Sequence, residues 1–230
     1  MMKRSSPLHR LAACLLPLAT LAAGSAPQAH AAESAKLNVT GTIMPPPCSI
    51  VLTNNRIDLG TLQASALHPL ARYGKHDAAR FSFHLQCAQP SRVRMRFTDN
   101  QANSVPEYHR DWAEARHGRP NMFGLGKVAG KNIGSYFMYF EPDSLKAGNV
   151  PVRPVYDDGP DEKPGYHLEN YNYILTTASL GWTGDRHIRA ASFERIDGEI
   201  VLSYMLEQPH DLPLEREITF NGWATIDLEY

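Results

Sequence analysis

Hydrophobic and polar residues alternate along much of the chain, and this period of two predicts β-strands rather than helices. Residues 79–98 carry two alternating sets, which we interpret as a hairpin with a tight turn at Gln89-Pro90-Ser91. The apolar positions are Phe81, Phe83, Leu85 and Cys87 in the first set and Val93, Met95 and Phe97 in the second. Arg92, Arg94 and Arg96 alternate with the second set, so one face of that strand is apolar and the other polar.

Similar patterns predict further short strands, and turn residues separate them. We expect strands at 49–59 with an interruption at Asn54-Asn55, and at 132–140, 171–178, 187–195, 198–207 and 216–229. The polar stretch 99–131 predicts a long connection with one short helix at 106–116, and the proline-rich stretch 141–170 predicts a loop or insertion. The pattern therefore predicts an all-β protein, an immunoglobulin-like β-sandwich with a long loop insertion.

The first residues have the pattern of a secretory signal peptide. An apolar run over 11–23 follows three basic residues, Lys3, Arg4 and Arg10. Ala29-His30-Ala31 is an A-x-A cleavage site. The apolar run is too short to span a bilayer. A lipoprotein box at 11–14 is the alternative, and its place at the start of the apolar run disfavours it. We expect a signal peptide at 1–31 and an exported chain that begins at Ala32.

Cleavage at this site removes Cys14 and leaves Cys48 and Cys87. In an oxidising compartment an even pair of cysteines normally closes a disulfide. The formal net charge is −1 at pH 7, so no basic surface for nucleic acid is expected.

Residues 32–47 lie before the expected disulfide loop and have no turn that would fold them back. Leu37, Val39 and Ile43 alternate, with Gly41 between them. This pattern predicts a short strand that pairs with something other than its own domain.

These features, in this order, resemble the subunits of bacterial chaperone–usher fimbriae. The likeness covers the expected mature chain. It rests on the N-terminal extension, the Gly41-x-Ile43-x4-Cys48 run, the Ile57-Asp58-Leu59-Gly60 segment, Cys87 at a strand end and the alternating C-terminal strand. Two stretches, 83–103 and 123–136, are more narrowly similar to β-fimbriae subunits.

The resemblance implies a fold and a mechanism of assembly. A pilin domain, here 41–230, is a sandwich that lacks its last strand. A periplasmic chaperone fills the open groove, and at the outer-membrane usher the extension of the next subunit replaces it. The extension at 32–40 would donate Leu37 and Val39. Gly41 follows in the same run, and Ile43 would either extend the donor set or begin the first strand of the domain. The groove and chaperone strand would carry Ile218, Phe220, Ala224, Ile226, Leu228 and the terminal Tyr230.

The same resemblance implies the protein's location and partners. The chain would be secreted through the inner membrane, pass through the periplasm and end in a cell-surface fimbria, without catalysis and without a cofactor. In many family members the aromatic residue is penultimate, and a glycine stands farther from the end than Gly222 does here. The register with a chaperone is therefore open.

Candidate sites for catalysis or metal binding are weak. His109, Asp111, Glu114 and His117 form the best metal-like cluster, although a solvated polar loop explains them more simply. The glycine run 124–131 fails the phosphate-loop pattern because Asn132 stands where Ser or Thr is required. The acidic run 157–162 lacks the ligand spacing of a calcium loop. We expect no catalytic, metal or cofactor site.

Four aromatic residues gather near the insertion: Tyr166, Tyr171, Tyr173 and Trp182. Such rings can cap a core or can stack on sugars, and the cap is the simpler interpretation. The alternative function follows from the second option. The chain would be a minor or adhesive subunit, or a soluble periplasmic binding module, that uses 141–185 to hold a glycan or protein, such as a host or surface ligand.

Overall fold

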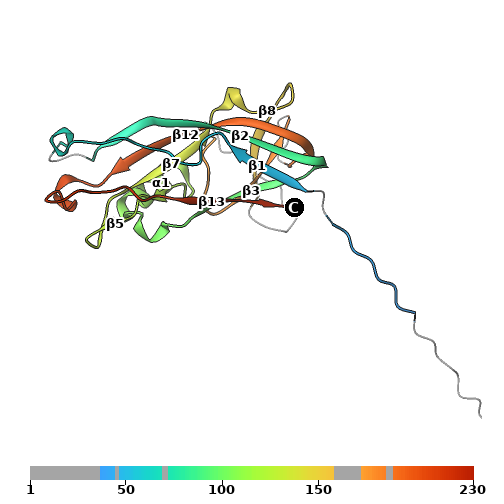
Figure 1. Ribbon diagram of the computed structural model, residues 1–230, viewed down its shortest axis with the longest axis horizontal. Helices are drawn as coiled ribbons and strands as arrows, with labels where there is room; N and C mark the ends of the chain where they lie inside the picture. The colour runs from blue at the N-terminus through green and yellow to red at the C-terminus, as the bar shows by residue number, and fades with distance from the viewer. Residues whose placement is uncertain (1–36, 45–46, 69–71, 158–171, 185–188) are drawn as a thin grey trace, which may run out of the picture. The chain divides into compact units, whose positions relative to one another are not determined.

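The computed structural model describes residues 37–44, 47–68, 72–157, 172–184 and 189–230. The chain divides into two units, Met1–Thr42 and Ile43–Tyr230, and every strand of the described residues belongs to the second. That unit is built mostly of antiparallel strands in two sheets with a shared hydrophobic core (Figure 1). The expected signal peptide and the first residues of the extension lie outside the described residues. Within the described ranges, no helix has the length and apolar character of a membrane span.

The larger sheet has seven strands, and its main path runs β1-β2-β12-β7-β4. The two longest strands, β2 and β12, lie side by side at its centre (Figure 1). Its strands are β1 (Cys48–Leu52), β2 (Gly74–Ser91), β4 (Phe123–Gly124), β7 (Gly134–Phe140), β8 (Lys146–Ala147), β9 (Val150–Pro151) and β12 (Phe193–Leu206).

The smaller sheet has four strands in the order β10-β11-β3-β13. They are β10 (Arg153–Asp157), β11 (Ser179–Thr183), β3 (Arg94–Asp99) and β13 (Ala224–Glu229). A separate small hairpin pairs β5 (Lys127–Val128) with β6 (Lys131–Asn132). The one α-helix of the described residues is α1 (Glu107–His117), and 3-10 turns occupy Ala64–Ala66, Ala102–Ser104, Pro142–Ser144 and Pro209–Asp211.

Alternation explains the core between the two sheets. Phe81, Phe83 and Leu85 of β2 are buried on one side, and Met95 and Phe97 of β3 are buried on the other. Aromatic rings join the two layers: the Trp182 ring of β11 lies 5.7 Å from Phe83 of β2 and 5.3 Å from Phe140 of β7. The expected disulfide between Cys48 and Cys87 is confirmed, and it joins directly opposed residues of β1 and β2.

The expected hairpin at 79–98 is wrong. β2 lies in the larger sheet and β3 in the smaller one, so the chain crosses between layers at Arg92-Val93. The alternating pattern shows which side of a strand is apolar, but it does not show which strand is its neighbour. The two apolar sets meet face to face across the core and not edge to edge.

Several element boundaries also differ from expectation. The segment 172–178 contains only an isolated bridge between Tyr173 and Tyr139, and the expected strands at 187–195 and 198–207 form one strand, β12. Position 198, inside β12, requires glycine because the side chains of Phe83 and Leu145 occupy the space that a Cβ would need. The stretch 141–157 holds three strands where a loop was expected, whereas the helix near 106–116 and the strand near 132–140 are confirmed.

Candidate functional site

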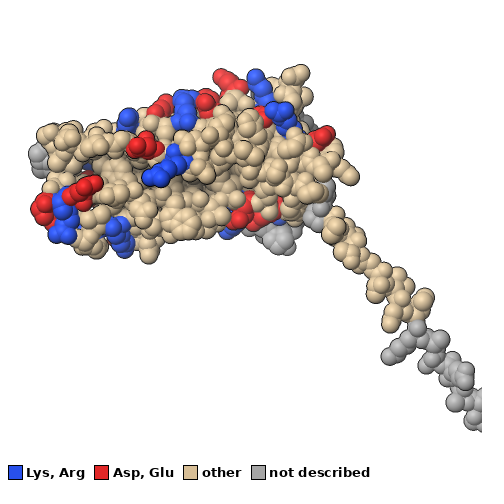
Figure 2. All heavy atoms as spheres, viewed as in Figure 1, with Lys and Arg blue, Asp and Glu red and all other residues tan. Residues whose placement is uncertain are grey.

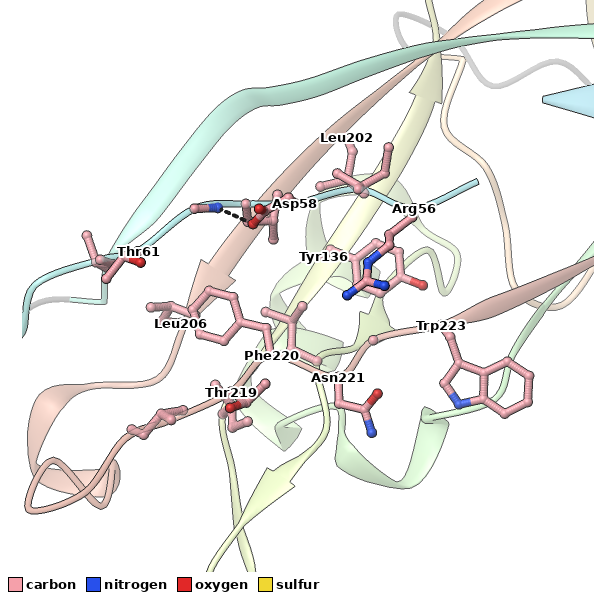
Figure 3. Close-up of a pocket in the computed structure, with 18 of the residues that line it drawn as sticks. Arg56, Asp58, Thr61, Tyr136, Leu202, Leu206, Thr219, Phe220, Asn221 and Trp223 are labelled. Atoms are coloured by element: carbon pink, nitrogen blue, oxygen red, sulfur yellow. Dashed lines mark hydrogen bonds between the residues drawn. The ribbon is translucent and has the colours of Figure 1, made fainter. Parts of the chain in front are cut away.

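A groove of about 870 Å³ opens between the segment 53–67, which follows β1, and the segment 212–223, which leads into β13 (Figure 3). Its floor comes from the inner faces of both sheets. The floor residues are Phe81, Phe97, Tyr136, Met138, Leu202 and Leu206. All six are buried and, apart from the Tyr136 hydroxyl, they are wholly apolar. The floor is therefore a hydrophobic surface, and a polar ligand placed against it would lose its contacts with water.

The first wall is the segment that follows β1. After Thr53, whose amide donates to the Ser82 carbonyl at 2.9 Å, the chain leaves the edge of β2. Side-chain turns then shape it: the Arg56 amide donates to Asn54 Oδ1 at 3.0 Å, and the Gly60 amide donates to Asp58 Oδ1 at 2.9 Å (Figure 3). Gly60 has φ +74°, a value that favours glycine. The wall presents its half-buried apolar residues, Ile57, Leu59, Leu62 and Leu67, to the groove.

The second wall is the segment that leads into β13. The Asn221 amide donates to the Leu125 carbonyl at 2.8 Å, and the Trp223 carbonyl accepts from the Asn100 amide at 3.2 Å. Between them, Gly222 lies against the Tyr136 ring, where a Cβ would come within 2.8 Å of the ring. Phe220 lies beside Leu206 in the groove, while Trp223 points away from the other labelled side chains (Figure 3).

Two strand edges face this groove. Among the described strands, β13 pairs only with β3, and β1 pairs only with β2. β1 covers only Phe83–Cys87 of the eighteen-residue β2, which leaves the first half of β2 without a strand on that side in the described residues. Outside the groove lining, the Cys48 amide at the start of β1 donates to the Tyr230 hydroxyl at 2.9 Å. Unpaired edges beside an apolar trough are the features that accept an added strand.

Charge does little to select a ligand here. The groove lining carries both signs: Arg56 and Arg216 are basic, and Asp58 and Glu217 are acidic. Figure 2 likewise shows acidic and basic groups interspersed over the viewed face of the protein, without an extended patch of one sign. Selectivity in this groove therefore depends on apolar shape and on backbone pairing.

The structure brings together part of the expected groove strand. Ile218, Phe220, Ala224 and Ile226 line the groove, although β13 begins only at Ala224, so Ile218 and Phe220 lie outside any strand. Leu228 and Tyr230 are not part of the groove lining: Leu228 packs against the core, and the Tyr230 hydroxyl accepts from the Cys48 amide. Sequence reasoning missed the first wall as groove lining, although the alternation of Ile57 and Leu59 was a usable signal.

The expected donor positions are described but are not in a strand. Leu37, Val39 and Ile43 are 87%, 86% and 98% exposed, and Gly41 has no atom within 4 Å of the position of a Cβ. Residues 37–44 have no regular secondary structure. Three large apolar side chains in contact with water are costly in an isolated chain.

The metal-like cluster does not assemble. His109 is fully buried, whereas Asp111 and Glu114 on the same helix are exposed. His117 instead lies 4.2 Å from the Tyr173 ring. In the part of the chain that the structure describes, no three His, Cys, Asp or Glu residues are placed to hold a metal ion. Among the glycines at 124–130, Gly126 precedes the β5-β6 hairpin and Gly130 lies in its turn, and both have a positive φ.

The aromatic residues near the insertion separate into two groups. Trp182 and Tyr173 are buried, and Trp182 belongs to the main core, which agrees with the cap interpretation. Tyr166 and Tyr171 lie outside the described residues, as does 158–162 of the acidic run. The described part of 141–185 contains β8 to β11, and of these strands β10 and β11 carry buried core residues such as Val155 and Leu180.

Comparison with known proteins gave no match among family models, curated proteins or solved structures. What the groove binds is therefore inferred from its own residues.

Proposed function

We propose that this chain is a structural subunit of a bacterial cell-surface fimbria and that a strand from a neighbouring subunit fills the groove. The domain would be an incomplete immunoglobulin-like sandwich of the chaperone–usher type. One observation carries the proposal: an apolar groove lies between the unpaired edge of β13 and the irregular segment after β1. A strand added there would cover half-buried apolar residues that line the groove and pair with an open backbone edge.

The chain itself contains a fitting strand. Leu37, Val39, Gly41 and Ile43 occur at every second position, so in an extended strand their side chains share one face. Burying a Leu, Val or Ile side chain contributes roughly 1.5–3 kcal/mol, so three such residues offset much of the cost of ordering the strand. The face that remains outside carries Asn38, Thr40 and Thr42, which suit a solvated surface.

Before assembly, the open groove is an aggregation hazard, so a periplasmic chaperone would cover it until an outer-membrane usher adds the subunit to the fibre. Each contact is head to tail and does not close, and repeated contacts of this kind build a filament. In this scheme the protein crosses the inner membrane, passes through the periplasm and remains at the cell surface, and it acts as a structural part and not as an enzyme.

The test uses residues 32–230 and two matched double variants. L37E/V39E places charge on the face that would enter the groove, and N38E/T40E adds the same charge to the opposite face of the same segment. We expect wild type and N38E/T40E to form fibres by electron microscopy, while L37E/V39E remains monomeric with an unchanged circular dichroism spectrum. Normal fibres from L37E/V39E would overturn the assignment of the donor strand.

A further inference from the structure

We infer that residues 54–67, the part of the first wall that follows Thr53, form a cover that an added strand must displace. The inference rests on the proposed function and deepens it, because it concerns how access to the same groove is regulated. The cover belongs to the unit Ile43–Tyr230, as do the second wall and the floor of the groove.

The groove floor is covered by side chains of its own domain. Its residues are only 1% to 8% exposed, although each of them lines the groove. The half-buried apolar residues beside them come from the two walls and from the adjoining ends of β1 and β13. A side chain of an added strand can therefore reach the floor only if part of one wall moves aside.

The cover is weakly fastened to the rest of the domain. The last backbone bond before it joins the Thr53 amide to the Ser82 carbonyl at 2.9 Å. In the described part of the chain, residues 54–67 make hydrogen bonds only among themselves, in turns such as the one between Gly60 and Asp58 (Figure 3). Apolar side chains alone hold the cover against the core. A segment without backbone bonds to its neighbours opens at a low cost in free energy.

The second wall, by contrast, is held by its backbone. The Asn221 amide donates to the Leu125 carbonyl at 2.8 Å, and the Trp223 carbonyl accepts from the Asn100 amide at 3.2 Å. The wall then continues without a break into β13, which pairs with β3 over its whole length. Of the two walls, the first is therefore the one that can move at the lower cost.

The cover also presents apolar side chains at the spacing of a strand. Ile57 and Leu59 are half-buried against the core, and Asp58 between them is exposed. Leu37 and Val39 of the extension have the same spacing. The cover and an added strand would therefore compete for the same apolar surface. If only the displaced state of the cover accepts the strand, the apparent affinity is reduced in proportion to the population of that state.

A fixed first wall would give the opposite behaviour. Its apolar residues would contact the added strand, so their removal would weaken binding. The same residues would also become less accessible to water when the strand is bound. The two arrangements thus differ in the sign of two measurable effects.

The first experiment measures binding of a synthetic peptide of residues 32–43 by titration calorimetry. The background protein is residues 32–230 with L37E/V39E, so that its own extension carries charge in place of the apolar donor pair. We expect the further change I57T/L59T, which weakens the cover, to tighten binding by about 10-fold. The matched control Q63T/S65T changes exposed residues of the same segment outside the groove lining, and it should leave the affinity unchanged. Weaker or equal binding by I57T/L59T would overturn the inference.

A second experiment does not depend on the stability of that variant. L59C is added to the same background, and the rate of its reaction with a thiol reagent is measured with and without saturating peptide. We expect the peptide to accelerate the reaction several-fold, because displacement of the cover exposes position 59. S65C, at an exposed position outside the groove lining, should react equally fast in both conditions. A slower or unchanged reaction of L59C would show that the wall stays in place.

These experiments separate failure of this inference from failure of the proposed function. If the peptide binds but does not accelerate the reaction of L59C, the inference is wrong and the proposed function stands. If the peptide binds neither the background protein nor its I57T/L59T variant, both are wrong.

Discussion

At the scale of single residues, a buried polar cluster lies directly behind the groove floor. His109 of α1 has its Nδ1 2.8 Å from Ser135 Oγ, and its Nε2 3.3 Å from Glu207 Oε1. Arg72 completes the cluster, with Nη2 3.3 Å from Glu207 Oε2 and its guanidinium 3.7 Å from the centre of the Tyr108 ring. Ser135 and Glu207 are close in sequence to Ile133 and Leu206, which line the groove, so the cluster fastens α1 to the strands of the floor.

This cluster should make stability depend on pH. Burial, and then the positive charge of Arg72, lower the pKa of His109 from 6.5 to about 4. Between these values the unfolded chain binds a proton that the folded chain does not bind, so stability is complete above pH 6.5 and falls as the pH drops toward 4. The Glu207 carboxylate attracts a protonated ring, which makes the following figure an upper value.

We predict that wild type loses at most about 2 kcal/mol of unfolding free energy through His109 between pH 7 and pH 5. The variant H109Q cannot titrate there, so its stability should change less over the same interval. Urea unfolding of both proteins at the two pH values measures the difference. An equal pH dependence of the two proteins would show that His109 is not the responsible group.

At the scale of elements, the close approach at Gly222 holds the second wall in place. A Cβ at this position would come within 2.8 Å of both the Gly124 carbonyl oxygen and the Tyr136 ring. The carbonyl belongs to the backbone of β4, and the Tyr136 ring is buried, so neither gives way cheaply. The wall must therefore move outward if residue 222 acquires a side chain.

We predict that G222A destabilises the domain by about 1–3 kcal/mol and weakens binding of the peptide 32–43 to residues 44–230. The matched control is G184A, because a Cβ at Gly184 would meet only Val150 at an ordinary 3.8 Å. Denaturant unfolding and a peptide titration measure both effects. If G222A behaves like G184A, the wall does not depend on this contact.

The element scale also shows what the sequence could predict. Alternation at Phe81, Phe83 and Leu85 correctly predicts a buried face, because side-chain direction along a strand is a local property. The same alternation does not show that β3 lies in the other sheet, since pairing is set by contacts between distant segments. For the same reason Ile218 and Phe220, which alternate like strand residues, line the groove from an irregular wall.

Other elements were hidden by composition. Prolines at 151 and 154 suggested a loop, yet they lie in β9 and β10, which have a free edge in the described residues where a missing amide donor is tolerated. The first groove wall was missed because its apolar residues stand among turn residues such as Asn54 and Gly60. The groove lies beside β1 and β13, each of which pairs with a single strand among the described residues, and the sequence pattern does not show such pairing.

At the scale of the whole molecule, two features are complementary. The domain has an apolar groove beside open strand edges, and the extension has exposed apolar residues at the spacing of a strand. Each is costly alone: the groove lies beside strand edges with unpaired backbone groups, and the extension exposes large apolar side chains to water. Their combination in separate copies would relieve both costs and would make assembly the stable state of the protein.

The most direct test of this account is the melting temperature of residues 44–230 with and without a peptide of residues 32–43. Peptide at 100 times its dissociation constant should add about 2.7 kcal/mol, a rise of roughly 5–10 °C for a domain of this size. A peptide with Glu in place of Leu37 and Val39 should have no effect. An already stable domain whose melting temperature does not change with the peptide would contradict the claim that the groove awaits a donor strand.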